Sequence, residues 1–185
     1  YETAAQEGAI DYDKTVQYPF GYGLSYTEFE QKMGELEEKD GQISVDVEVT
    51  NTGDVAGKDV VEVYYKPPYT NGGIEKSSAN LIEFEKTNLL QPGESQTVTV
   101  TFSIEDMASY DENNAKAYVL EKGDYVISIN SDSHTVLDQK TYTADKDVVY
   151  KGENKRASDD TAATNVFEDA KGDVTYLSRA DHFAN

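Results

Sequence analysis

The middle of the chain alternates apolar and polar residues with the period of a β-strand. Residues 42–50 place an apolar side chain at every second position, and residues 59–66 and 97–104 repeat the pattern. Because successive side chains of a strand point to opposite faces, this alternation is typical of antiparallel strands with one buried face. We expect these strands to share one core. That core is predicted to contain Ile43, Val45, Val47, Val49, Val61, Val63, Val98, Val100, Phe102, Ile127 and Ile129.

The remainder of the middle region adds weaker strand signals. Residues 81–90 and 135–142 are extended candidates, and residues 116–120 and 124–130 are expected to form a hairpin across 121–123. About seven short strands, with turn residues roughly every 8–12 positions, are typical of a two-sheet sandwich. No long helical period interrupts them, which argues against a parallel α/β sheet. We therefore predict an all-β fold, an immunoglobulin-like two-sheet sandwich with extended N- and C-terminal segments.

Charge and composition exclude several classes of function. The 185 residues include 36 acidic and 16 basic side chains, and the formal net charge is -20. Such a surface repels nucleic-acid phosphates and anionic lipids, so we expect neither nucleic acid nor a membrane as a partner. Cysteine is absent, which rules out disulfides, thiol catalysis and zinc–thiolate sites.

An aromatic motif precedes the alternating region, where residues 18–27 read YPFGYGLSYT. The two glycines on either side of Tyr22 permit backbone conformations that other residues avoid. The proline and the aromatic rings would form a rigid apolar unit. Two interpretations are open: a packed crossover between two domains, or a platform on which sugar rings stack. The aromatic residues are Tyr18, Phe20, Tyr22 and Tyr26.

This motif resembles one found in family 3 glycoside hydrolases, the β-glucosidase family. In that family the motif follows an α/β sandwich domain and leads into a fibronectin type III-like domain. The resemblance continues in order and spacing over roughly residues 10–132. The segments that carry it are residues 18–27, 49–57, 61–69, 81–84, 90–95 and 123–125.

The resemblance implies a division of the chain and a role for it. Residues 1–25 would be the end of the preceding α/β domain with the crossover motif, residues 26–145 a fibronectin type III-like β-sandwich, and residues 146–185 a linker and docking tail. The sandwich would be a non-catalytic structural domain that buttresses its partners, the catalytic barrel and the α/β sandwich domain, in an enzyme that hydrolyses β-glucosides with retention. Residues 165–181 are also similar to a segment of family members with reversed domain order, in which the barrel comes last.

No residue of the chain is assigned to catalysis, to a cofactor or to a metal. Retaining hydrolysis needs two carboxylates that flank the scissile bond, and the resemblance implies that both belong to the other domains. His134 and His182 are far apart in the sequence, and each is interpreted as a surface residue. Residues 169–173 superficially suggest a calcium loop but lack the EF-hand spacing. The pair Gly21 and Gly23 lacks the lysine of a phosphate-binding loop.

Two rival functions from other classes stay open. A carbohydrate-binding module would show a row of exposed aromatic side chains on one sheet face and a measurable affinity for glycans. An immunoglobulin-like adhesion domain would occur in tandem copies, with an anchor signal in the full gene. Either a cytoplasmic or a secreted bacterial protein would fit the sequence, and we favour the former.

Overall fold

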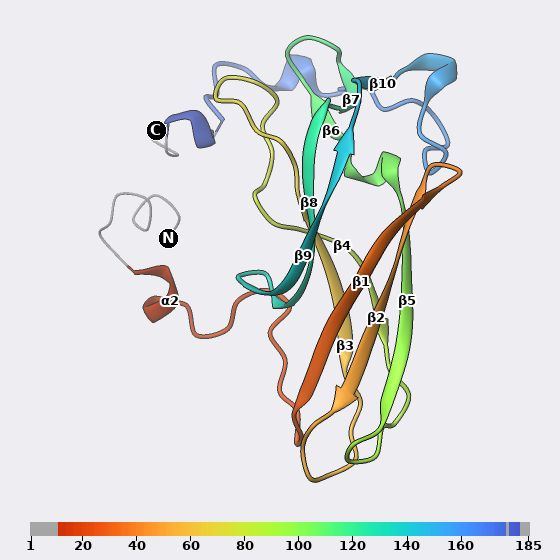
Figure 1. Cartoon of the computed structure of the whole chain (residues 1–185). Coiled ribbons are helices and arrows are strands. Elements are labelled where there is room, and N and C mark those ends of the chain that lie inside the picture. Colours follow the sequence, from red (N-terminus) through yellow and green to blue (C-terminus); the bar gives the residue numbers. More distant parts are fainter. Residues whose placement is uncertain (1–10, 177, 182–185) are drawn as a thin grey trace.

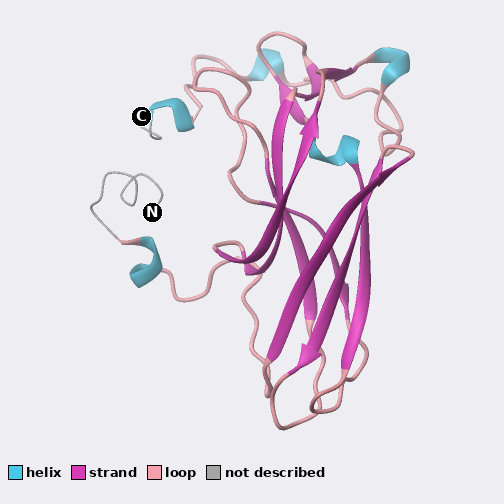
Figure 2. Cartoon of the chain, in the orientation of Figure 1, coloured by secondary structure: helices cyan, strands magenta, loops and turns pink. Residues whose placement is uncertain are grey.

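Three antiparallel sheets make up the fold (Figure 1, Figure 2). The computed structural model describes residues 11–176 and 178–181. The sheets have the strand orders β1-β2-β5, β4-β3-β8-β9 and β10-β7-β6. The strands are β1 (Phe29–Lys39), β2 (Gln42–Asn51), β3 (Val60–Lys66), β4 (Asn80–Lys86), β5 (Ser95–Ser103), β6 (Ser109–Asp111), β7 (Ala117–Leu120), β8 (Gly123–Asp132), β9 (Thr135–Ala144) and β10 (Val148–Tyr150). The helical turns are α2 (Tyr12–Thr15), η1 (Ile104–Met107), η2 (Gly152–Asn154), η3 (Glu168–Ala170) and η4 (Arg179–Asp181).

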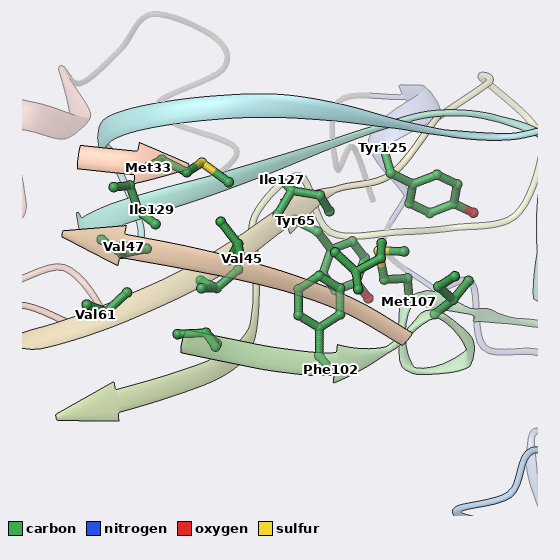
Figure 3. Packing of buried hydrophobic residues seen from close by; sticks show 14 of the residues in the cluster. Met33, Val45, Val47, Val61, Tyr65, Phe102, Met107, Tyr125, Ile127 and Ile129 are labelled. Atoms are coloured by element: carbon green, nitrogen blue, oxygen red, sulfur yellow. The ribbon is translucent and has the colours of Figure 1, made fainter. Parts of the chain in front are cut away.

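The sheets β1-β2-β5 and β4-β3-β8-β9 pack face to face around one core (Figure 3). Every residue predicted for this core is buried in it. Met33, Tyr65 and Met107 extend it further. Removing a valine, isoleucine or phenylalanine side chain from water contributes about 1.5–3 kcal/mol, so this shared core is the main source of stability. The predicted all-β two-sheet sandwich is confirmed.

The first strand, β1, was not evident from the alternation of residues. It pairs with β2 along its length but buries only Met33 among its side chains, because glutamate and lysine fill most other positions. Asp40 and Gly41 join the two strands, with φ angles of 53° and 79°. Two positive φ angles at the centre of a two-residue loop are the geometry that fits the twist of a hairpin, and Asp-Gly favours it.

The hairpin predicted from residues 116–120 and 124–130 is wrong. Both segments are strands, β7 and β8, but β7 pairs with β6 and β10, whereas β8 pairs with β3 and β9. Both edges of β8 are therefore occupied, and β7 turns away into the third sheet. The backbone N–H of Lys122 donates to Asp147 Oδ1 at 2.6 Å, which ties the connection to the loop before β10.

The sandwich has open sheet edges and two long terminal segments. β4 lies at the edge of its sheet next to β3, and its Phe84 is 59% exposed although alternation placed it with Ile82. In Figure 1 both described ends of the chain lie to the left of the sheets. Among the described residues, no helix is long and apolar enough to cross a membrane.

Candidate functional site

The aromatic segment, residues 18–26, runs along the surface of the sandwich before β1. Its apolar side chains are exposed rather than packed: Tyr26 is fully exposed, Leu24 is 87% exposed and Phe20 is 68% exposed. The rings of Tyr18 and Tyr22 contact each other at a centroid distance of 5.2 Å. Two rings of the predicted apolar unit therefore contact each other, but its side chains do not pack into this chain's own core.

The first attachment of the aromatic segment is to the sheet β4-β3-β8-β9. The carbonyl of Phe20 accepts a hydrogen bond of 2.8 Å from the backbone N–H of Ser133, in the β8–β9 turn. Gly21 has a φ of 83° and lies directly over Glu62 and Tyr64 of β3. A Cβ atom at this position would collide with the Glu62 carboxylate and the Tyr64 hydroxyl. Only glycine therefore fits this approach without displacing its neighbours.

The second attachment is at Asn51, which is completely buried at the end of β2. Thr27 Oγ1 donates to Asn51 Oδ1 at 2.9 Å. The Asn51 amide group donates to the carbonyls of Val55 and Leu90 at 2.8 and 2.9 Å. The carbonyl of Glu28 accepts from the backbone N–H groups of the two residues that follow Asn51, at 2.8 and 3.2 Å. The aromatic segment is thus fixed at both ends while its rings stay in solvent.

A polar pair lies beneath Gly21 on the outer face of the four-stranded sheet, the face turned away from the core. Tyr64 Oη donates to Glu62 Oε2 at 2.9 Å. Burial raises the pKa of the Glu62 carboxyl, and the bond from Tyr64 offsets part of that rise. Burial also raises the pKa of Tyr64 itself, so its hydroxyl keeps its proton and remains a donor.

The C-terminal segment, residues 151–181, is attached to the other end of the sandwich. The Arg156 guanidinium stacks on the Tyr118 ring at 3.7 Å and binds both carboxylate oxygens of Asp159. Lys116 Nζ pairs with Glu168 at 2.7 Å. The stretch expected to be a linker therefore follows the third sheet closely. Such stacked and paired arginines fix a backbone more strongly than single surface ion pairs do.

The end of this segment binds the β3–β4 loop. The Arg179 guanidinium lies 4.0 Å from the centre of the Tyr69 ring and donates to the carbonyl of Lys76 at 2.8 Å. Ser178 Oγ donates to Glu75 Oε2 at 2.8 Å. Between its attachments the segment exposes further apolar side chains, those of Val166, Phe167, Val174 and Tyr176.

A cleft opens at the C-terminal end of β1. The second attachment of the aromatic segment lies at the opposite end of this strand. The cleft is lined by acidic side chains such as Glu38, Asp40 and Glu105, together with the half-buried rings of Tyr142 and Tyr150. Burial raises the pKa of both tyrosines. Aromatic rings beside carboxylates are a chemistry that suits sugars as well as cations, so this cleft is where carbohydrate binding would be sought.

The residues considered for metal or acid–base chemistry lie in separate places. His134 is in the β8–β9 turn, where its backbone N–H donates to Asp132 Oδ1 at 2.8 Å. His182 lies outside the described residues. Within residues 169–173, Lys171 lies over the ring of Tyr176 at 4.6 Å. Across the described part of the chain, no three histidine or acidic side chains come together as metal ligands.

The domain has clear relatives among known proteins. Residues 59–133 match the family model of the fibronectin type III-like domain. The chain is 36% identical to a β-glucosidase of Kluyveromyces marxianus over 75% of its length, and 36% identical to a β-glucosidase of Ruminococcus albus over 91% of its length. A solved GH3 β-glucosidase of Bifidobacterium adolescentis superposes with a TM-score of 0.64 at 30% identity, over 72% of this chain and 19% of that one.

The share of each relative that is covered is small. The chain spans 16% of the Kluyveromyces protein and 18% of the Ruminococcus protein. In these relatives the region is therefore one part of a much longer polypeptide. The resemblance to β-glucosidases inferred from the motifs is confirmed.

Proposed function

We propose that this chain, with a fibronectin type III-like domain of the kind that family 3 β-glucosidases carry, acts as a non-catalytic accessory domain. It docks on the catalytic parts of a β-glucosidase-like enzyme and holds them in position. One observation carries the proposal: the aromatic segment is fixed at both ends, yet it leaves its rings in water. A pre-ordered apolar ridge of this kind is a docking surface, because its backbone loses little further entropy on binding.

The proposed partners are the catalytic barrel and the α/β sandwich domain of the same enzyme. Residues 1–25 would lead from the α/β domain, residues 26–145 form the sandwich, and residues 146–185 dock as a tail. The reaction of the whole enzyme would be retaining hydrolysis of β-glucosides, which needs two carboxylates about 5 Å apart. We assign neither carboxylate to this chain, so the domain contributes position and not chemistry.

The proposal is tested by removing the exposed ridge. The triple variant Phe20→Ser/Leu24→Ser/Tyr26→Ser is made in the full-length protein and in the 185-residue chain. The matched control replaces exposed apolar residues elsewhere, Leu89→Ser and Val149→Ser, which are 55% and 42% exposed. We expect the ridge variant to lower the melting temperature and activity of the full-length protein, with the isolated chain unchanged. If the ridge and control variants of the full-length protein gave equal melting curves, docking through the ridge would be contradicted.

A second experiment separates docking from carbohydrate binding. The isolated chain is incubated with a chromogenic β-glucoside and titrated calorimetrically with cello-oligosaccharides. We expect no turnover above the buffer blank and no saturable heat. Turnover would overturn the non-catalytic role. Saturable binding that is lost on replacing Tyr142 or Tyr150 in the cleft would instead favour a carbohydrate-binding module.

A further inference from the structure

We infer that the outer face of the sheet β4-β3-β8-β9, beside the aromatic segment, receives a cationic side chain, arginine by preference, from the domain that docks there. The inference rests on the proposed docking function and specifies it further. It names the point on the surface where docking is polar rather than apolar. The carboxylate that would receive the cation is Glu62.

The register of the strands builds a polar centre at this point. Glu62 of β3 lies directly opposite Asn130 of β8, and Tyr64 lies opposite Ser128. All four alternate with the core residues of the same strands, so they belong to the outer face. Asn130 is only 2% exposed, and its Oδ1 has no hydrogen-bond partner among the described residues. A buried acceptor without a donor is uncommon, and its partial negative charge adds to that of the neighbouring Glu62 carboxylate.

Negative charge gathers around this centre, because Asp132 and Asp59 both act on Glu62. The hydroxyl of Tyr64 is already used on Glu62. The Asp132 carboxylate accepts the backbone N–H groups of the β8–β9 turn, from His134 and Thr135. A group that carries several N–H donors and a positive charge satisfies such a centre, and a guanidinium does so better than a single ammonium.

Among the described residues, neither a lysine nor an arginine forms an ion pair with Glu62. The chain's two arginines, Arg156 and Arg179, are both bound at the other end of the sandwich, to Asp159 and to the β3–β4 loop. With a net charge of -20, the chain also favours a basic partner surface. The neighbouring domain of a longer polypeptide is the occupant that fits, since the relatives carry this region as 16–18% of their length.

Apolar side chains lie beside the polar centre on the same face of the sheet. Phe84 of β4 lies opposite Glu62 on the same face and is 59% exposed, and Val136 of β9 pairs with Asn130. Phe20, which precedes Gly21 in the aromatic segment, also exposes its ring. A polar pair enclosed by apolar contacts is shielded from water, and this is the arrangement in which a single charged residue contributes most to binding.

The test uses charge variants in the full-length protein, with limited proteolysis as a measure of docking. Glu62→Lys reverses the charge, and Glu62→Gln keeps the shape of the side chain while removing the charge. The matched control is Glu48→Lys, at an exposed position of β2. We expect Glu62→Lys to speed proteolytic separation of the domain at least about tenfold, Glu62→Gln to do so by a smaller factor, and the control to stay within about twofold.

Two further readouts make the result decisive. Unfolding of the 185-residue Glu62→Gln chain should match that of the unaltered chain, which excludes a folding defect. N-acetyl-arginine methyl ester, added to the isolated chain, should shift the NMR signals of Gly21 and of the Asn130 amide more than N-acetyl-norleucine methyl ester does. If the ridge variant weakens docking but Glu62→Lys equals its control, docking stands and the cation site is wrong. If the ridge variant also has no effect, the proposed function fails with it.

Discussion

Two apolar regions of this chain differ in their exposure to solvent. The valines and isoleucines of the alternating strands are completely or almost completely buried, whereas the rings of the aromatic segment lie in solvent. The difference follows from how each backbone is held. The strands are ordered because their side chains pack, but the aromatic segment is ordered by hydrogen bonds to Ser133 and Asn51. We therefore expect its side chains to contribute little to folding and to remain accessible to a partner.

The largest effect is expected at the centre of the core. Val47 is fully buried between the two sheets, so Val47→Asp places an unpaired charge there and should unfold the domain, at a cost above about 4 kcal/mol. Circular dichroism and denaturant titration measure this. Glu48→Asp, on the exposed face of the same strand, is the control and should be neutral. A folded and soluble Val47→Asp protein would disprove this core.

A smaller loss is expected at Asn51. Asn51→Ala removes the donor for the carbonyls of Val55 and Leu90 and the acceptor for Thr27, and should cost about 2 kcal/mol of unfolding free energy. Chemical denaturation provides the measurement, with the exposed Asn88→Ala as the matched change. Equal midpoints for the two variants would show that Asn51 does not connect the aromatic segment to the sandwich.

The next effect is local and distinguishes two nearby glycines. Gly21→Ala meets Glu62 and Tyr64 and also requires a positive φ, while Gly23 has no atom within 4 Å of an added Cβ. We expect Gly21→Ala to cost about 1–2 kcal/mol and to speed amide exchange at Ser133, whose N–H bonds to Phe20. Gly23→Ala should leave exchange unchanged. Similar exchange rates in both variants would contradict the close approach at Gly21.

The smallest effect is expected at the exposed rings themselves. In the isolated chain, Phe20→Ser and Tyr26→Ser should each change stability by less than about 0.5 kcal/mol, because neither ring packs on the sandwich. Thermal unfolding of each variant measures this. A loss similar to that of Asn51→Ala would mean that the rings stabilise this domain directly, and the contrast between the two regions would disappear.

The sequence was informative where side-chain burial alone decides structure. Alternation identified the strands that form the sandwich core, including Val47 and Ile127, because one buried face imposes a period of two. It failed at β1, where Met33 is the only buried side chain and the hairpin is specified by Asp40 and Gly41 instead. The Asp-Gly pair itself predicts a two-residue hairpin turn, but the alternation of apolar and polar residues takes no account of turn residues.

The pairing of strands and the exposure of side chains depend on the whole fold, so they were harder to predict from the sequence. The segments β7 and β8 were both recognised as strands, but their pairing was wrong because β3 and β9 occupy both edges of β8. The aromatic motif was recognised by resemblance, yet no local pattern distinguishes rings that are packed from rings that are presented. Nor does the sequence reveal that Glu62 and Asn130 are opposite each other, since that requires the register of two strands far apart in the chain.

The most direct test of the docking account compares side-chain accessibility of the aromatic segment in two settings. Hydroxyl-radical footprinting with mass spectrometry measures the labelling of Tyr18, Phe20 and Tyr26 in the 185-residue chain and in the full-length protein. Phe84 reports on the sheet face beside them, and the exposed Leu89 is the internal reference. The account predicts strong labelling of the segment in the isolated chain and at least severalfold protection in the full-length protein, with Leu89 labelled equally in both. Equal labelling of the aromatic segment in both proteins would contradict its role as a docking surface.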